Sequence, residues 1–391
     1  MTDPIENDVE RCCQCTLPIT WETLNFDDSG VCNICRNWEE KFQQIDWDTR
    51  CEALRGICRE QQAAARAAGR KYDCILPFSG GKDSTYTLWF VVRELGLRPL
   101  VVSFDHGFYR PRTLSNRLKT FRKLGVDVLT FTPSWALVKK LMLESLIRRG
   151  DFCWHCHAGV FVYPMQEAVR QGVPLVIWGE GGGEYEAYFK YGNIEETDEW
   201  KFNRRIIQGM RAEDMAGFIN VAPEELAPFT YPPKEELDRI GVKSLPLGNF
   251  IPWDVRKNVE VIKRELDWEE DVIESGFPGV TYEKIECQFT GVRDYVKLLK
   301  RGFARITHLT TLDIRHGRMT REEAMRLIQK YEKRKPKSLE VFLEYVGLKE
   351  DEFHDIVAKH LIHPAPRIEP GSMPEGEKLW DQDLWYREDN R

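Results

Sequence analysis

Short apolar runs alternate with helical patterns between residues 74 and 179. An apolar run from Cys74 to Phe78 ends in Ser-Gly-Gly, and apolar residues then recur at helical spacing from Lys82 to Leu95. This pattern predicts a buried strand, a tight loop and a helix. Further strands are expected over 98–105, 126–132 and 173–179, with a helix over 113–124. The alternation predicts an α/β fold with a doubly wound parallel sheet.

The pattern changes on both sides of this region. Residues 36–70 are rich in Ala, Arg, Glu and Gln and predict a linker helix. After about residue 193 the alternation stops, and Thr320 to Glu323 form a capping box that opens a helix in a mainly helical C-terminal region. A chain of 391 residues exceeds the usual single domain of about 100–200 residues. We expect a knuckle with linker helix over 1–70, an α/β domain over 71–240 and a helical domain with a flexible tail over 241–391.

The loop after the first strand predicts an anion site. Two glycines let the backbone approach a ligand closely, and the first N–H groups of the helix lack internal partners. These donors and the helix dipole favour an anion. The common phosphate loop is excluded, because Leu76 occupies its first glycine position and Asp83 follows Lys82. The candidate ligand-binding residues are Ser79, Gly80, Gly81, Lys82, Asp83 and Ser84.

Polar residues also follow other strands of the predicted sheet. Asp105 follows the second strand, and Gly179 and Glu180 follow the fourth. Ligands of doubly wound folds bind outside the carboxyl ends of the strands, so we expect these residues beside the loop. The glycine-rich run 179–183 with its carboxylates suits Mg²⁺ or a hydroxyl-bearing substrate.

Two CxxC pairs near the N-terminus predict a zinc knuckle. Sixteen residues separate the pair Cys12 and Cys15 from the pair Cys32 and Cys35. Each turn aims two thiolates at one point, and two turns supply the tetrahedral sulfur set that zinc prefers. Unmetallated thiols are the alternative, and Cys13 is a competitor for the position of Cys12.

A second cysteine group lies inside the predicted sheet domain. Cys153 and Cys156 form a CxxC with interleaved histidines, and Cys287 is the only later cysteine that could join them. The group is either a metal or redox site, or a set of small buried residues at a helix start. The sequence leaves both interpretations open.

Charge and hydropathy narrow the function classes. The net charge of −7 argues against a nucleic-acid-coating protein, although residues 293–335 hold 13 Lys or Arg against 5 Asp or Glu. That stretch is a candidate polyphosphate or RNA contact, or simply a solvated helical face. The acidic start is no secretory signal, and the chain lacks an apolar run of about 20 residues. We therefore expect a cytoplasmic protein without a membrane partner.

The motif of residues 79–84 resembles the PP-loop of the N-type ATP pyrophosphatases. This resemblance implies that ATP is split between its α- and β-phosphates into AMP and pyrophosphate. The ordered set of motifs resembles the N-acetyl sugar amidotransferase family of surface-polysaccharide biosynthesis. The motifs are the paired CxxC head, 77–84, 151–159, 177–180, 251–254 and 313–322.

The resemblance implies an ATP-dependent amidotransferase in lipopolysaccharide O-antigen or related surface-glycan biosynthesis. Its substrate is an N-acetyl sugar, expected to be UDP-linked, and ammonia comes from glutaminase and cyclase-like partner proteins. Ser79, Lys82, Asp83 and Glu180 are the expected catalytic residues, with Mg²⁺ supported by Asp83 or Glu180. The arginines expected to reach phosphate groups are Arg301, Arg305, Arg315 and Arg318.

Two other functions fit parts of the sequence. PP-loop tRNA sulfur transferases resemble this chain in a zinc-ribbon head, and there Cys153, Cys156 and Cys287 would hold an iron–sulfur cluster. The basic stretch would then contact tRNA. A nucleotide-binding scaffold subunit without activity is the third interpretation.

Overall fold

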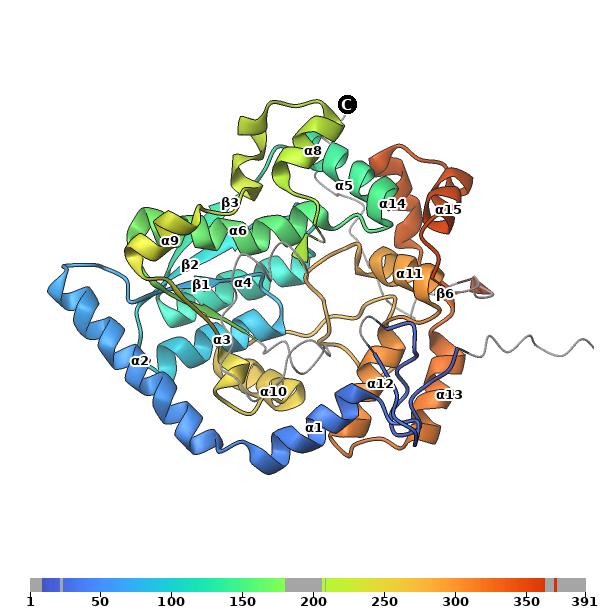
Figure 1. Ribbon diagram of the computed structural model, residues 1–391, viewed down its shortest axis with the longest axis horizontal. Helices are drawn as coiled ribbons and strands as arrows, with labels where there is room; N and C mark the ends of the chain where they lie inside the picture. The colour runs from blue at the N-terminus through green and yellow to red at the C-terminus, as the bar shows by residue number, and fades with distance from the viewer. Residues whose placement is uncertain (1–8, 22–23, 180–205, 208, 363–368, 371–391) are drawn as a thin grey trace, which may run out of the picture.

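A five-stranded parallel sheet lies at the centre of the computed structural model, which describes residues 9–21, 24–179, 206–207, 209–362 and 369–370 (Figure 1). The strand order is β3-β2-β1-β4-β5. The strands are β1 Cys74–Pro77, β2 Pro99–Phe104, β3 Asp127–Phe131, β4 Leu175–Trp178 and β5 Lys243–Pro246. All four pairings are parallel. The predicted α/β fold with a doubly wound parallel sheet is confirmed.

Helices cover both faces of the sheet because neighbouring residues of each strand point to opposite sides. Leu76 packs in a core with α2 (Trp47–Ala67), α3 (Lys82–Arg93) and α10 (Val255–Leu266). Ile75 packs in the opposite core with α5 (Trp135–Arg149), α6 (Trp154–Gln171) and α8 (Ala212–Ile219). The helix α4 (Pro111–Leu124) joins the first layer through Leu124. The carboxyl end of β1 is therefore buried between two helical layers.

The C-terminal region is helical, as predicted. It contains α11 (Thr290–Arg301), α12 (Arg305–Arg315), α13 (Arg321–Tyr331), α14 (Ser338–Val346) and α15 (Glu350–Ala358). The helices α11, α14 and α15 pack on Val138, Met142 and Leu146 of α5. The predicted capping box is present, since Thr320 and Glu323 exchange hydrogen bonds at the start of α13. Two short strands, β6 (Arg334–Lys335) and β7 (Glu369–Pro370), pair in parallel.

The expected domain boundary at residue 240 does not coincide with the end of the sheet. The strand β5, at residues 243–246, pairs with β4, and α10 packs on α3 within the sheet core. The helix α9 (Lys234–Ile240) precedes this strand. A four-residue strand containing proline carries little sequence signal, so β5 escaped prediction. No helix in the described ranges has both the length and the apolarity to cross a membrane.

The N-terminal segment lies beside the C-terminal helices rather than beside the sheet. Figure 1 shows residues 9–21 and 24–32 next to α12 and α13, while α1 (Asn33–Gln44) and α2 lead back to the sheet. The Thr16 hydroxyl lies 2.9 Å from that of Thr311, and the Thr20 hydroxyl donates to the Arg301 carbonyl at 2.7 Å. The knuckle is thus built into the C-terminal helical region.

Candidate functional site

The PP-loop connects β1 to α3 in the predicted way. Gly80 has φ +90°, a conformation that glycine adopts without strain. The Ser84 hydroxyl accepts hydrogen bonds from the N–H groups of Ser79, at 3.3 Å, and Gly80, at 3.1 Å. The Gly81 N–H donates to the Ser79 hydroxyl at 3.3 Å. The two serines therefore hold the loop backbone in a tight turn at the start of α3, where the helix dipole favours an anion.

Arg117 of α4 supports the loop from behind. Its guanidinium donates to the Ser79 carbonyl at 3.4 Å and to the Ser103 hydroxyl at 3.0 Å, and it stacks over the Tyr109 ring. A methyl group on Gly80 would lie 2.7 Å from the Arg117 side chain. The arginine is buried, so it places a fixed positive charge behind the loop. Sequence reasoning missed this residue, because nothing in the pattern of α4 distinguishes it from a surface arginine.

Lys82 is buried and paired with two carboxylates. Its Nζ lies 2.7 Å from Asp83 Oδ2 and 2.6 Å from Glu283 Oε2. Burial disfavours the charged ammonium, but Asp83 and Glu283 raise the pKa of Lys82 well above the ordinary lysine value. Burial would in turn raise the pKa of Glu283, but Lys82 and Arg305 lower it overall. Lys82 is therefore a permanent cation at physiological pH.

The segment between β5 and α11 brings a second carboxylate to the loop. A methyl group on Gly81 would lie 2.8 Å from a Glu286 carboxylate oxygen. The Oδ1 atom of Asp83 is buried without a hydrogen-bond partner among the residues that the structure describes. Carboxylate oxygens are the ligands that a magnesium ion prefers. Asp83 and Glu286 are therefore the residues beside the loop that could hold such an ion.

Two residues at other strand ends have defined contacts. Asp105 Oδ1 accepts from the Gly107 N–H at 2.8 Å, so one of its oxygens is used in a turn. A methyl group on Gly179 would lie 3.2 Å from the Thr87 hydroxyl and 3.7 Å from the Asp83 Cβ, which places Gly179 against the start of α3. Glu180 lies outside the described residues.

The arginines of α11 and α12 serve structural contacts. Arg301 donates to the Thr20 carbonyl of the knuckle at 2.6 Å. Arg305 forms ion pairs with Glu283 at 3.1 Å and with Asp294 at 2.9 Å. Burial would lower the pKa of the Arg315 guanidinium, but Cys15, Cys35 and Cys32 raise it, which places Arg315 beside the cysteine cluster.

The structure therefore does not place these three arginines where they were expected. Arg305 is the nearest to the loop, separated from Lys82 by Glu283. Arg318 pairs with Asp254 and Asp313. Part of the basic stretch 293–335 is thus neutralised by internal contacts, which weakens its interpretation as a polyphosphate or RNA contact.

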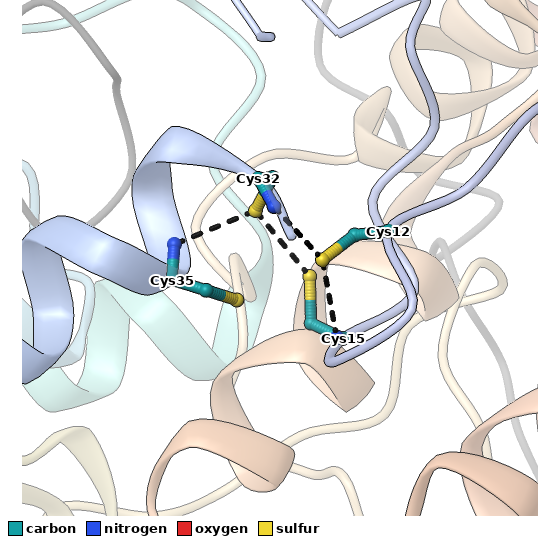
Figure 2. A group of neighbouring side chains, drawn as sticks. All are labelled: Cys12, Cys15, Cys32 and Cys35. Atoms are coloured by element: carbon teal, nitrogen blue, oxygen red, sulfur yellow. Dashed lines mark hydrogen bonds between the residues drawn. The ribbon is translucent and has the colours of Figure 1, made fainter. Parts of the chain in front are cut away.

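The four N-terminal cysteines converge on one point (Figure 2). Their sulfur atoms lie within 4.8 Å of one another, and all four residues are buried. Cys15 Sγ and Cys32 Sγ are 3.8 Å apart. Four sulfurs at about 2.3 Å from a tetrahedral zinc ion would be about 3.8 Å apart, so the cluster fits such an ion. The group Cys12, Cys15, Cys32 and Cys35 could therefore hold a metal ion.

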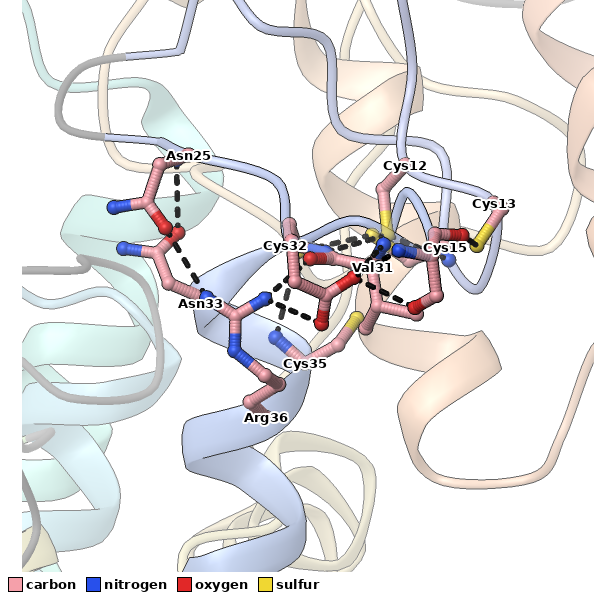
Figure 3. Close-up of polar contacts among 11 residues, drawn as sticks. Cys12, Cys13, Cys15, Asn25, Val31, Cys32, Asn33, Cys35 and Arg36 are labelled. Carbon is pink, nitrogen blue, oxygen red and sulfur yellow. Dashed lines mark hydrogen bonds and ion pairs between the residues drawn. The ribbon is translucent and has the colours of Figure 1, made fainter.

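The thiols of Cys12 and its neighbour Cys13 make different contacts (Figure 3). Cys12 Sγ accepts from the N–H groups of Cys15, at 3.4 Å, and Cys32, at 3.2 Å, whereas exposed Cys13 donates to the Ser29 carbonyl. Backbone N–H groups directed at a sulfur stabilise a thiolate. Cys12 is the metal-ligand candidate.

The cysteines of the second group do not assemble in the same way. Among the described residues, only the knuckle cysteines form a group of three or more potential ligands within 4.8 Å of one another. Burial raises the pKa of Cys156 and of Cys287 to about 12. The three thiols still lie near enough to influence one another, since, besides burial, Cys156 and Cys287 raise the pKa of Cys153 and Cys287 raises that of Cys156. Cys153, Cys156 and Cys287 are therefore neighbours that are not drawn together as tightly as the knuckle cysteines.

Comparison with known proteins gives a family match for the C-terminal region that contacts the PP-loop. Residues 279–368 match the family model described as "LPS biosynthesis protein WbpG-like, C-terminal domain". This region is therefore similar to a WbpG-like C-terminal domain, and we call residues 279–368 the WbpG-like domain. The match agrees with the resemblance stated from the motifs. Both Glu283 and Glu286 belong to this WbpG-like domain, and both reach the loop of the sheet domain.

Two further similarities are to single proteins. A protein of Methanocaldococcus jannaschii, "Uncharacterized protein MJ1599", is 24% identical over 181 residues, which are 46% of this chain and 60% of that protein. The chain thus spans less than two thirds of that relative. The structure of NMN synthetase from Francisella tularensis is also similar. The alignment covers 57% of this chain and 88% of the synthetase chain, with 12% identity and a TM-score of 0.28. Likeness at that level supports no conclusion about activity.

Proposed function

We propose that the protein is an ATP-dependent amidotransferase that converts the acetamido group of an N-acetyl sugar into an acetamidino group. The observation that carries the proposal is the contact between the PP-loop and the WbpG-like domain, with Lys82 Nζ 2.6 Å from Glu283 Oε2. The loop has the donors of a pyrophosphate site, and the domain matches proteins of lipopolysaccharide biosynthesis. Together they favour ATP chemistry on a surface-glycan sugar.

The reaction is balanced by ATP and ammonia. The acetamido oxygen attacks the α-phosphorus of ATP and forms a P–O bond, while the bond to the β-phosphate oxygen breaks and pyrophosphate leaves. Ammonia then attacks the imidate carbon, and the C–O bond breaks to release AMP. After loss of protons, C=NH replaces C=O. The products are the amidine, AMP and pyrophosphate.

Residues of the loop are proposed to stabilise the charge of the phosphate groups. The N–H groups of the loop and the Lys82 ammonium would stabilise the negative charge that develops on the leaving pyrophosphate. Arg117 adds a buried positive charge behind the Ser79 carbonyl. Mg²⁺, held by Asp83 and Glu286, would neutralise phosphate charge when bound. The Ser79 and Ser84 hydroxyls keep the loop in its turn, so their loss would displace the donors.

The remaining parts of the proposal rest on the same resemblance. The sugar is proposed to be UDP-linked, ammonia to come from glutaminase and cyclase-like partner proteins, and the reaction to occur in the cytoplasm, where ATP is available. The knuckle metal is proposed to be zinc, with a structural role, because four cysteines leave no open coordination position.

The test is an incubation with Mg-ATP, ammonium and a panel of UDP-linked N-acetyl sugars. We expect AMP and pyrophosphate in equal amounts, formed only when a suitable sugar is present. Formation of ADP would contradict the proposed cleavage site. ATP binding without AMP release with any sugar would favour a scaffold subunit instead.

A further inference from the structure

A chain of buried charges runs from the PP-loop to α12. Lys82 pairs with Glu283, whose other oxygen lies 3.1 Å from an Arg305 nitrogen. Arg305 in turn holds Asp294 of α11 through two nitrogen atoms, at 2.9 and 3.0 Å. Lys82 thus connects through three successive ion pairs to the helices of the WbpG-like domain. We call Lys82, Glu283, Arg305 and Asp294 the relay.

Each member of the relay is shielded from water. The exposed side-chain fractions are 3% for Lys82, 6% for Glu283, 11% for Arg305 and 5% for Asp294. Buried charges persist only when each has a partner, because removal from water is costly for every ion. Loss of one partner therefore changes the electrostatic environment of the others.

The relay has little freedom to rearrange. The backbone near Glu283 is tied to the sheet domain, since the Thr113 hydroxyl donates to the Ile285 carbonyl at 2.9 Å and the Gln288 N–H donates to the Phe108 carbonyl at 2.9 Å. Glu332 accepts from the N–H groups of Ala304 and Thr307, each at 2.8 Å, and so fixes the start of α12. Glu283 is anchored to one domain and Arg305 to the other.

We propose that Glu283 is a positioning residue, which holds the Lys82 ammonium in place beside the loop while Arg305 and Asp294 fix the Glu283 carboxylate. Its effect on turnover rests on the proposed function, but the arrangement of Lys82 does not. A lysine held by a fixed carboxylate is preorganised for phosphate, because it need not be ordered when ATP binds. The WbpG-like domain thereby controls the geometry of the ATP site.

The direct test measures how tightly Lys82 is held without any substrate. The full chain is labelled with limiting acetic anhydride at one fixed pH, and the rate of acetylation at Lys82 is read by peptide mass spectrometry. A buried ammonium held between two carboxylates is shielded from the reagent. We therefore expect Glu283→Gln to raise the acetylation rate of Lys82 by at least about tenfold, because a buried ion pair is broken and only Asp83 still holds the side chain.

A matched control carries the same chemical change elsewhere. Glu274→Gln alters a half-buried carboxylate that accepts hydrogen bonds from the Ser338 hydroxyl and the Lys337 N–H. It should leave the acetylation rate of Lys82 unchanged. Glu283→Asp and Arg305→Lys keep the charges but shorten or loosen the contacts, so each should give a smaller rise in the rate if Glu283→Gln does not fold.

Turnover separates the two proposals. If the relay positions Lys82, AMP release by Glu283→Gln should fall by about 100-fold, as expected for a misplaced catalytic group. An acetylation rate of Lys82 equal to that of the wild type in a folded Glu283→Gln variant would overturn the relay. A raised rate in a protein that forms no amidine with any sugar would instead retain the relay and remove the proposed function.

Discussion

Lys82 Nζ lies 2.6 Å from Glu283 Oε2, so a residue of the PP-loop and a residue of the C-terminal WbpG-like domain form one buried ion pair. The loop lysine is therefore held by the domain that the lipopolysaccharide-biosynthesis match covers. This contact is one of those that join the matched C-terminal region to the loop at the carboxyl end of β1.

Removal of Glu283 should destabilise the folded protein. Glu283→Ala leaves the buried ammonium of Lys82 and the guanidinium of Arg305 with one carboxylate partner fewer each. Breaking a buried pair from one side costs about 3–5 kcal/mol, and we expect a loss of that order in the free energy of unfolding. Urea denaturation of Glu283→Ala, Lys82→Met and the double variant measures it. The double variant should lose less than the sum of the single losses, and strict additivity would show that the pair makes no coupled contribution.

Gly80 should tolerate no side chain. Gly80→Ala would strain a residue with φ +90° and press a methyl group to 2.7 Å from the Arg117 side chain. We expect a loss of stability of about 1–3 kcal/mol and loss of AMP release, measured by thermal unfolding and by AMP quantification. The matched control is Gly217→Ala in α8, where the added methyl group meets nothing within 4 Å. That variant should gain about 0.5–1 kcal/mol and keep its activity.

Local sequence patterns were sufficient to predict the loop but not its partners. Residues 74–95 predict a strand, a glycine turn and a helix, because the sequence signal for each element lies within a few residues. Glu283 and Glu286 lie in an irregular segment about 200 residues later, without periodicity or a motif. Only the folded chain brings them to the loop, through the contacts of residues 285 and 288 with Thr113 and Phe108.

The arginines show the opposite error. Residue type and count correctly marked the 293–335 stretch as rich in cations. Their partners could not be read from spacing, because Asp294, Glu283 and the knuckle approach them from other elements. The expectation that Arg301, Arg305 and Arg315 bind phosphate overlooked these internal acceptors. The strand β5 was missed for a related reason, since four residues are too few to show a period.

The knuckle should bind one metal ion through Cys12 and not through Cys13. Cys12→Ser removes a buried thiol of the four-cysteine group, whereas Cys13→Ser changes an exposed thiol. We expect one equivalent of zinc in the wild type and in Cys13→Ser, and a markedly lower content with a lower melting temperature in Cys12→Ser. Inductively coupled plasma mass spectrometry gives the metal content. Equal zinc contents in the two variants would show that Cys12 is not the ligand.

The knuckle should also support the C-terminal helices. Arg321 donates to the carbonyls of Cys12, at 3.2 Å, and Cys15, at 3.0 Å, so the metal-binding turn is tied to α13. Chelation of the metal should therefore raise amide hydrogen exchange in α12 and α13 more than in the sheet. Exchange that rises only within residues 9–35 would show that the knuckle is independent of these helices.

Acid should destabilise the protein through His106. Burial lowers the pKa of His106 to about 4, while Asp105 raises it and Arg117 lowers it. The unfolded chain binds this proton at about pH 6.5. The free energy of unfolding therefore falls by roughly 3 kcal/mol as the pH falls from about 6.5 towards 4. His106→Gln keeps an acceptor for the Phe108 N–H and should flatten this part of the stability profile. A profile equal to that of the wild type would contradict the shift.

The fate of the ammonia nitrogen tests the proposed function most directly. The protein is incubated with Mg-ATP, nitrogen-15 ammonium and the UDP-linked N-acetyl sugar that supports AMP release, with Asp83→Ala as the inactive control. We predict one labelled nitrogen in the sugar product, replacing one oxygen of the acetamido group, with one AMP formed for each amidine. AMP release that leaves the sugar unlabelled and with its oxygen intact would contradict the amidotransferase assignment.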